Sequence, residues 1–190
     1  MFNSTNSQLT EFDGCRTCRM AWNDSFLDLF FRCVKRYESG DKDFTGYYGD
    51  HDSAFLKEIG YKPREFFDFV EDFCDEGTPS ASTALLVASV RRDYFIEVMD
   101  RAPGSKSLTA NDVPTFGDTF NNVPYLPRIL AKARAKLRGE LDPDLMFGCG
   151  GDRNFLRKHG DIHPADFLRE VWAAGDDDEK ILEWIRSHGG

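Results

Sequence analysis

Apolar residues recur at every third or fourth position through most of the chain, which is the spacing of one buried helix face. In the first half this pattern predicts helices over residues 24–37, 53–60, 63–77 and 82–101. In the second half it predicts helices over 125–139 and 178–188, with two further helices between them in the sequence. Glycine or proline separates most of these segments, as expected at helix ends. The sequence therefore predicts an all-α fold.

The two halves share one order of helix breakers and apolar residues. When they are overlaid, the same residue types meet at an almost constant offset: Gly40 with Gly139, Phe55 with Phe155, Gly60 with Gly160, Pro63 with Pro164, and Val70 with Val171. We therefore predict two tandem copies of a small four-helix unit, packed as a pseudo-dimer. The predicted parts are a polar leader (1–22), a diverged first repeat (23–101), a linker (102–122) and a second repeat (123–190).

Charge and composition exclude several classes of protein. The chain has 24 Lys and Arg against 33 Asp and Glu, a formal net charge of −9, which argues against binding to nucleic acid or to an anionic membrane surface. The 17 phenylalanines fall at helical spacings and are core material. The polar start, the lack of a long apolar run and the odd number of cysteines, five, predict a cytoplasmic protein with free thiols and no cofactor.

The segment Tyr125 to Gly139 is a basic helix in an acidic protein. On a helical wheel Tyr125 belongs to the apolar face, Arg128 and Lys132 follow one edge of it, and Arg134 follows the other. Such an edge is either a solvated surface or an anion site that meets a carboxylate or phosphate. In the overlay the first half has Leu29 and Cys33 opposite Arg128 and Lys132, so a site, if present, belongs to the second half.

Cys149 lies in a glycine-rich segment, Phe147-Gly-Cys-Gly-Gly-Asp152, just before a predicted helix. A thiol near a helix N-terminus can be a nucleophile, with Asp152 as general base. The glycines can instead present amides to an anion, with Asp152 as a helix cap. In the simplest interpretation the glycines form a turn and Cys149 packs as a small apolar residue.

Other candidate chemistry is weaker. Cys15-Arg-Thr-Cys18 has the spacing of half a zinc site or a redox pair, but it has neither a second CxxC nor a nearby histidine. The acidic run 176–178 suits a helix N-terminus better than a metal site. His163 precedes Pro164 and is a candidate cap, and nothing in the spacing requires His159 to pair with Cys149. No metal site is predicted.

Several motifs of the second half occur together: Tyr125, Leu126-Pro127-Arg128, Lys132-Ala133-Arg134-Ala135, Gly139, Cys149, Asp152, Phe155, Phe167-Leu168, Asp177 and Trp184. Over residues 120–188 they resemble an uncharacterised bacterial family, domain of unknown function 5069. Two segments depart from its pattern, at 122–124 before the tyrosine and at Gly150-Gly151. The resemblance implies an α-helical bacterial domain and leaves the activity open.

Two functional hypotheses follow. In the first, the second half binds a small anionic metabolite through Tyr125, Arg128, Lys132 and Arg134, and Cys149 and Asp152 are catalytic or contact the ligand. In the second, the chain is a helical scaffold or protein-interaction module without chemistry. The first predicts that these side chains converge on a concave pocket, and the second that they lie apart on a convex surface.

Overall fold

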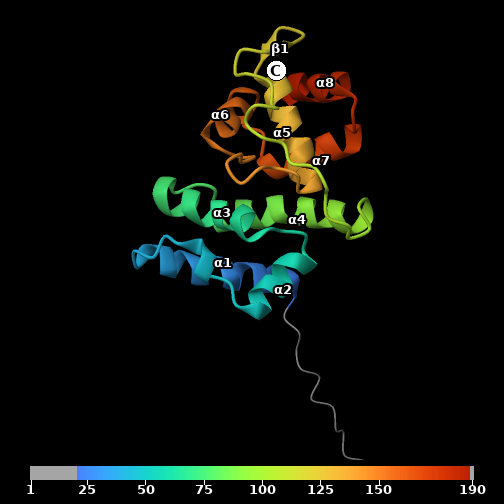
Figure 1. The fold of residues 1–190 in the computed structure, drawn as a ribbon. Coiled ribbons are helices and arrows are strands. Elements are labelled where there is room, and N and C mark those ends of the chain that lie inside the picture. The colour runs from blue at the N-terminus through green and yellow to red at the C-terminus, as the bar shows by residue number, and fades with distance from the viewer. Residues whose placement is uncertain (1–20, 189–190) are drawn as a thin grey trace, which may run out of the picture.

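The computed structural model describes residues 21–188 and confirms an all-α fold (Figure 1). The described chain forms eight α-helices, one 3₁₀-helix and two strands of two residues each. In chain order they are α1 (Trp22–Glu38), η1 (Phe44–Gly46), α2 (Asp50–Glu58), α3 (Pro63–Glu76), α4 (Ala81–Glu97), β1 (Thr119–Phe120), β2 (Val123–Pro124), α5 (Leu126–Arg138), α6 (Gly150–Lys158), α7 (Pro164–Ala174) and α8 (Asp178–His188).

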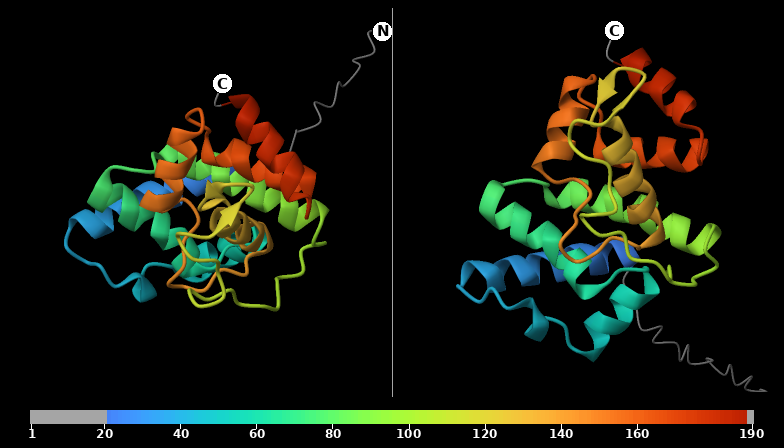
Figure 2. Two further views of the ribbon diagram at one scale, coloured as in Figure 1. Left: turned by 90° about the horizontal axis from the view of Figure 1, so that it is seen from above. Right: turned by 45° about the horizontal axis from the view of Figure 1, so that its top comes forward.

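Helix α4 lies between the two halves of the chain. It packs on α1 in its own half and on both α5 and α7 in the second half. The ribbon views show α3 and α4 as a middle layer, with α1 and α2 on one side and α5 to α8 on the other (Figures 1 and 2). One continuous core results, because buried apolar residues of both halves belong to a single cluster.

Phenylalanine side chains build the core of the first half. Phe26 and Phe30 on α1 lie edge-on against Phe66 and Phe73 on α3, with ring centroids 5.0 Å and 5.5 Å apart respectively. Edge-to-face contacts of this kind are favourable beyond the area they bury. The predicted burial of the phenylalanines is confirmed for Phe26, Phe30 and Phe66, whereas it is wrong for Phe31 and Phe116, which are 48% and 68% exposed.

Helix α5 is enclosed on more sides than the wheel analysis indicated. Its predicted apolar face is buried, but Lys132, Ala135 and Lys136 are buried as well, with exposed fractions of 1%, 1% and 3%. The reason is tertiary: α4 and α7 both pack on α5, Lys132 meets Asp152 of α6, and Lys136 meets Glu65 of α3. The basic helix is thus the centre of the second half rather than a helix with free cationic edges.

The predicted helix ends hold to within a few residues. Gly77 ends α3 in the left-handed conformation, and Ser80 caps α4 by accepting a hydrogen bond from the Thr83 amide. Helix α1 begins at Trp22 instead of residue 24, because the Trp22 ring packs on Phe26. Helix α4 ends at Glu97 rather than at residue 101.

The order of elements is the same in both halves, four helices in each. Helices α2 and α6 have nine residues each, and α3 and α7 both begin at a proline. The packing of α1 on α3 is repeated by α5 on α7. The internal duplication and the pseudo-dimer arrangement stay predictions. The leader that was assigned to residues 1–22, with Cys15 and Cys18, lies almost entirely outside the described residues.

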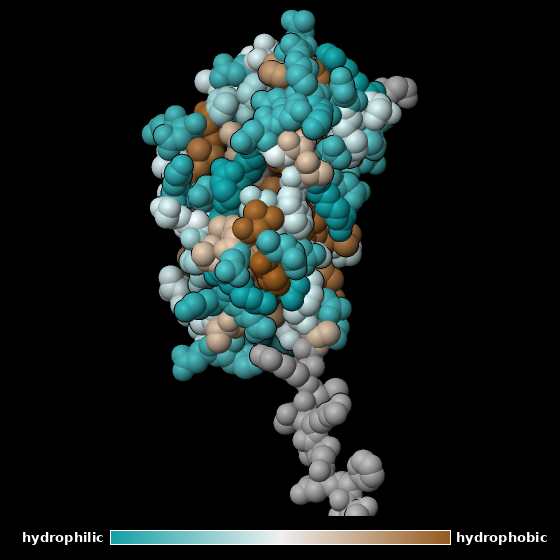
Figure 3. Space-filling view, turned by 90° about the vertical axis from the view of Figure 1, so that its right-hand side faces the viewer, coloured by the Kyte–Doolittle hydropathy of each residue, from teal (hydrophilic) through white to brown (hydrophobic). Residues whose placement is uncertain are grey.

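No helix within residues 21–188 combines the length and the apolar character needed to cross a membrane. On the face shown in Figure 3, hydrophilic side chains cover most of the area, and apolar ones gather near the middle.

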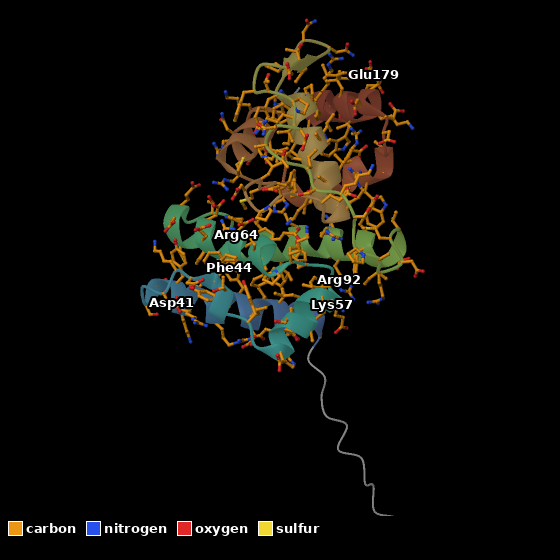
Figure 4. All side chains as sticks on the ribbon, viewed as in Figure 1. Asp41, Phe44, Lys57, Arg64, Arg92 and Glu179 are labelled. Atoms are coloured by element: carbon orange, nitrogen blue, oxygen red, sulfur yellow. The ribbon has the colours of Figure 1, made fainter. Side chains whose placement is uncertain are left out.

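A small hairpin that the sequence analysis did not anticipate spans the end of the predicted linker and the start of the predicted second repeat. Strands β1 and β2 pair in antiparallel fashion across Asn121 and Asn122, both of which have positive φ, 47° and 63°. Asparagine is one of the few residues that adopt this turn readily. Asn121 also donates to Glu179 at the start of α8, 2.8 Å away (Figure 4). The hairpin therefore joins the start of α5 to α8.

Two adjacent phenylalanines on α1 test the core assignment. Phe30 is fully buried, whereas Phe31 is 48% exposed. Phe30→Ala should lower the free energy of unfolding by about 3–5 kcal/mol, and Phe31→Ala by less than about 1 kcal/mol. Urea denaturation followed by circular dichroism measures both, and equal losses would contradict the packing of α1 described above.

Candidate functional site

The structure brings four of the six predicted site residues together around a buried ion pair. Lys132 on α5 donates from Nζ to Oδ2 of Asp152 on α6 at 2.7 Å, and the two side chains are 2% and 0% exposed. An ammonium and a carboxylate are both costly to bury alone, so each requires the other in this position. The pair fixes α6 against α5.

Asp152 accepts two further hydrogen bonds. The Tyr125 hydroxyl donates to Oδ1 at 2.8 Å, and the backbone amide of Gly148 donates to Oδ2 at 2.8 Å. Burial, followed by the charge of Asp152, raises the pKa of Tyr125, so its hydroxyl remains protonated and able to donate. Asp152 thus ties together the start of α5, the interior of α5 and the turn before α6.

Cys149 is held at the edge of this cluster as the N-cap residue of α6. Lys132 Nζ also donates to its Sγ at 3.2 Å, and the residue is partly exposed. Gly151 is required here, because a Cβ at that position would lie 2.6 Å from the Tyr125 hydroxyl oxygen. By contrast Cys33 is buried, and burial raises the pKa of its thiol to about 12. Cys149 is therefore the more accessible of these two thiols.

The other two predicted ligand-binding residues lie elsewhere. Arg128 donates to the carbonyl oxygen of Pro114 at 2.7 Å and stacks over the Phe116 ring, 4.5 Å from its centroid. Arg134 donates to the carbonyl oxygen of Gly175 and, at 2.6 Å, to Asp178. These two arginines hold the linker and the α7–α8 turn against α5, and they do not converge on Lys132.

The remaining candidates act as local supports. His159 Nδ1 contacts the carbonyl oxygen of Phe155 rather than Cys149. His163 caps α7, accepting from the Ala165 amide, as the sequence suggested. Asp177 accepts from the Lys180 amide at the start of α8. Within residues 21–188 no three His, Cys, Asp or Glu residues are grouped so as to hold a metal ion.

A cavity of 270 Å³ adjoins the cluster at the turn before α6. The second half contributes residues 146–148, Arg153 and Arg157, and the first half closes it with residues 77–80. Arg153 is held by the Gly148 carbonyl at 2.6 Å and by Asp72 at 3.1 Å, and it also pairs with Glu76. Arg157 is exposed and forms no ion pair within the described chain.

Sequence analysis did not single out these two arginines. They are four residues apart and therefore lie on one side of α6, and this spacing was the sequence feature that could have identified them. The contribution of residues 77–80 had no such signal, because it depends on how the two halves pack.

A double-mutant cycle tests the Lys132–Asp152 pair. Asp152→Ala leaves a buried ammonium without a counter-ion and should cost about 3–5 kcal/mol of stability. Lys132→Met added to Asp152→Ala should recover part of that loss, and chemical denaturation measures both. The control cycle uses Asp166 and Arg169, which are 58% and 51% exposed and should couple by less than about 0.5 kcal/mol. If the coupling energies of the two cycles were equal, burial would contribute nothing to the strength of the Lys132–Asp152 interaction.

The comparisons with known proteins bear on this half of the chain alone. No curated protein and no solved structure matches the sequence. One family model does match, and it covers the β1–β2 hairpin, the whole ion-pair cluster and α8. Residues 117–190 match the family described as a domain of unknown function, DUF5069, which confirms the predicted resemblance of the second half.

Proposed function

We propose that the chain binds a small anionic metabolite in the cavity between α6 and the turn 77–80, with Cys149 as the thiol beside it. A single observation carries the proposal. The turn 147–149 belongs both to the cavity wall and to the buried cluster, because Phe147 and Gly148 line the cavity while Cys149 Sγ contacts Lys132. A ligand in the cavity therefore lies against the backbone that positions the thiol.

The charge of the cavity favours an anion. Two arginines, Arg153 and Arg157, line it against one acidic residue, Asp161, and of the two arginines only Arg153 is paired with carboxylates in the described chain. The first turn of α4, with Ser80 and Thr83, and the start of α7 at Pro164 also face it. Helix N-termini carry partial positive charge, which adds to that of the guanidinium groups. The volume of 270 Å³ lies just below the usual range for drug-sized ligands and suits a small metabolite.

Within this proposal Lys132 and Asp152 have different roles. Lys132 supplies a cationic donor at Sγ, which stabilises the negative charge that develops on sulfur as it reacts. Asp152 already accepts from Lys132, Tyr125 and Gly148, so its oxygens are engaged. We therefore assign Asp152 to positioning the turn rather than to proton transfer.

One observation favours the alternative of a helical scaffold. The three cations predicted to bind a ligand, Arg128, Lys132 and Arg134, all have protein partners. A chain in which every such cation supports the fold requires no ligand. The two proposals differ in what they predict for Arg157, whose side chain supports no other element.

Binding is tested by changing Arg157. Inorganic phosphate, malonate, citrate and glycerol phosphate are titrated into the full chain by calorimetry and thermal shift. At least one should bind, and Arg157→Ala should weaken it about tenfold, since one charge-assisted hydrogen bond is lost. Arg169→Ala, an exposed arginine on α7, is the control. Failure of all four probes, or an equal effect of the control, would favour the scaffold.

Thiol reactivity is tested by alkylation with iodoacetamide and peptide mapping. Cys149 should react faster than Cys33, which is buried, and Lys132→Met should slow the reaction at Cys149 because sulfur loses its cationic donor. Lys158→Met, which changes an exposed lysine at the end of α6, should leave the rate unchanged. If Lys132→Met left the alkylation rate at Cys149 unchanged, the role given to this lysine would be contradicted.

A further inference from the structure

A larger cavity of 560 Å³ lies in the first half, away from the cluster around Lys132. The end of α2, the start of α3, the last turns of α4 and the segment 101–104 form its walls, and Gly139 after α5 completes it. Lys57 on α2 is one of its lining residues and appears with Arg92 of α4 in Figure 4.

Arg91 on α4 is the unusual residue of this cavity. Its side chain is 1% exposed, and Nη2 donates to the carbonyl oxygen of Gly60 at 2.9 Å. Its Nε and Nη1 are buried and have no hydrogen-bond partner among the described residues. The guanidinium carbon lies 5.4 Å from the Phe95 ring centroid, and Gly139 packs directly against the guanidinium. Gly60, Phe95 and Gly139 all line the cavity, so the guanidinium lies in its wall.

Buried charges in folded proteins are normally paired, because an isolated one is costly to remove from water. Arg91 forms no ion pair within residues 21–188. Glu65, a carboxylate of the adjoining helix α3, forms its ion pair with Lys136 at 2.7 Å instead of with Arg91. The fold thus holds a buried guanidinium that has no carboxylate within ion-pair distance among residues 21–188.

The lining residues of the cavity add to this positive charge. Four of them are basic, Lys57, Lys62, Arg91 and Arg101, and one is acidic, Glu58. That excess occurs in a protein whose formal net charge is −9. Between the charged groups the walls are apolar or aromatic, with Ala54, Tyr61, Pro63, Phe95 and Pro103. Cations beside an apolar wall are complementary to a molecule that has one anionic end and an apolar body.

We propose that this cavity binds an organic carboxylate with an apolar body, whose carboxylate neutralises Arg91. The apolar body lies against Phe95 and Tyr61, and Lys62 is at the exposed mouth. A carboxylate bound against this wall supplies the negative charge that the guanidinium lacks at ion-pair distance within the described chain. Glycine at 60 and 139 is part of the site, because a Cβ at either position would collide with Phe95 or with Arg91.

Calorimetry with the full chain tests the proposal, using benzoate, 4-phenylbutanoate and octanoate as probes and benzamide as the neutral counterpart of benzoate. At least one carboxylate should bind saturably, and benzamide should not. Arg91→Met should weaken binding about ten- to a hundredfold, and Lys62→Glu at the exposed mouth should weaken it also. Arg92→Met is the matched control, since Arg92 pairs with Asp93 and stacks on Trp22.

Stability gives a second readout that does not depend on the choice of probe. Arg91→Met should raise the melting temperature of the ligand-free protein, because it removes a buried charge without a counter-ion. Arg157→Ala should leave carboxylate binding here unchanged, which separates this site from the cavity at α6. Three results would overturn the proposal: no binding of any carboxylate, binding unaffected by Arg91→Met, or a lower melting temperature of the ligand-free Arg91→Met protein.

Discussion

The second half of this chain depends on the burial of one ammonium group. Lys132 is enclosed by α5, α6 and the turn between them, and such a position is tolerable only because Asp152 meets it at 2.7 Å. The carboxylate in turn orders Tyr125 and Gly148 by accepting their hydrogens. One electrostatic requirement thus determines the start of α5, the placement of α6 and the position of Cys149.

Other cations of the molecule differ in burial and in whether a carboxylate meets them. Lys136, one turn after Lys132, is buried against Glu65 of α3 and so joins the two halves. In the first half, α1 and α2 are linked by Arg32 and Asp52 at 2.7 Å, where Arg32 is half exposed and little energy depends on the pair. Arg91 is the exception, because it is buried and two of its nitrogens have no hydrogen-bond partner within residues 21–188. Since the fold supplies a carboxylate to both buried lysines of α5, its absence at Arg91 is the basis for inferring a ligand there.

Local sequence signals predicted the helices well and the site only in part. Glycine at 77 and 139 and proline at 63 and 164 act through their own backbone geometry, so they mark helix ends whatever surrounds them. Which cations of α5 are buried depends instead on partners from other parts of the sequence, Asp152 of α6 for Lys132 and Glu65 of α3 for Lys136. The wheel therefore placed Arg128 and Lys132 on one edge, while the structure binds the first to Pro114 and the second to Asp152. Arg91 was overlooked because burial of a lone arginine has no sequence pattern.

The predicted overlay of the two halves pairs a charged position with an apolar one. In that overlay Lys132 corresponds to Cys33, a buried thiol whose pKa is raised to about 12 by burial and which packs as an apolar residue. An apolar residue at such a position is often as stable as a buried ion pair, or more so. The Lys132–Asp152 pair is therefore not explained by stability alone. It brings a cationic donor to within 3.2 Å of the sulfur of a partly exposed cysteine, next to a cavity lined by two arginines, whereas Cys33 in the first half is a buried thiol.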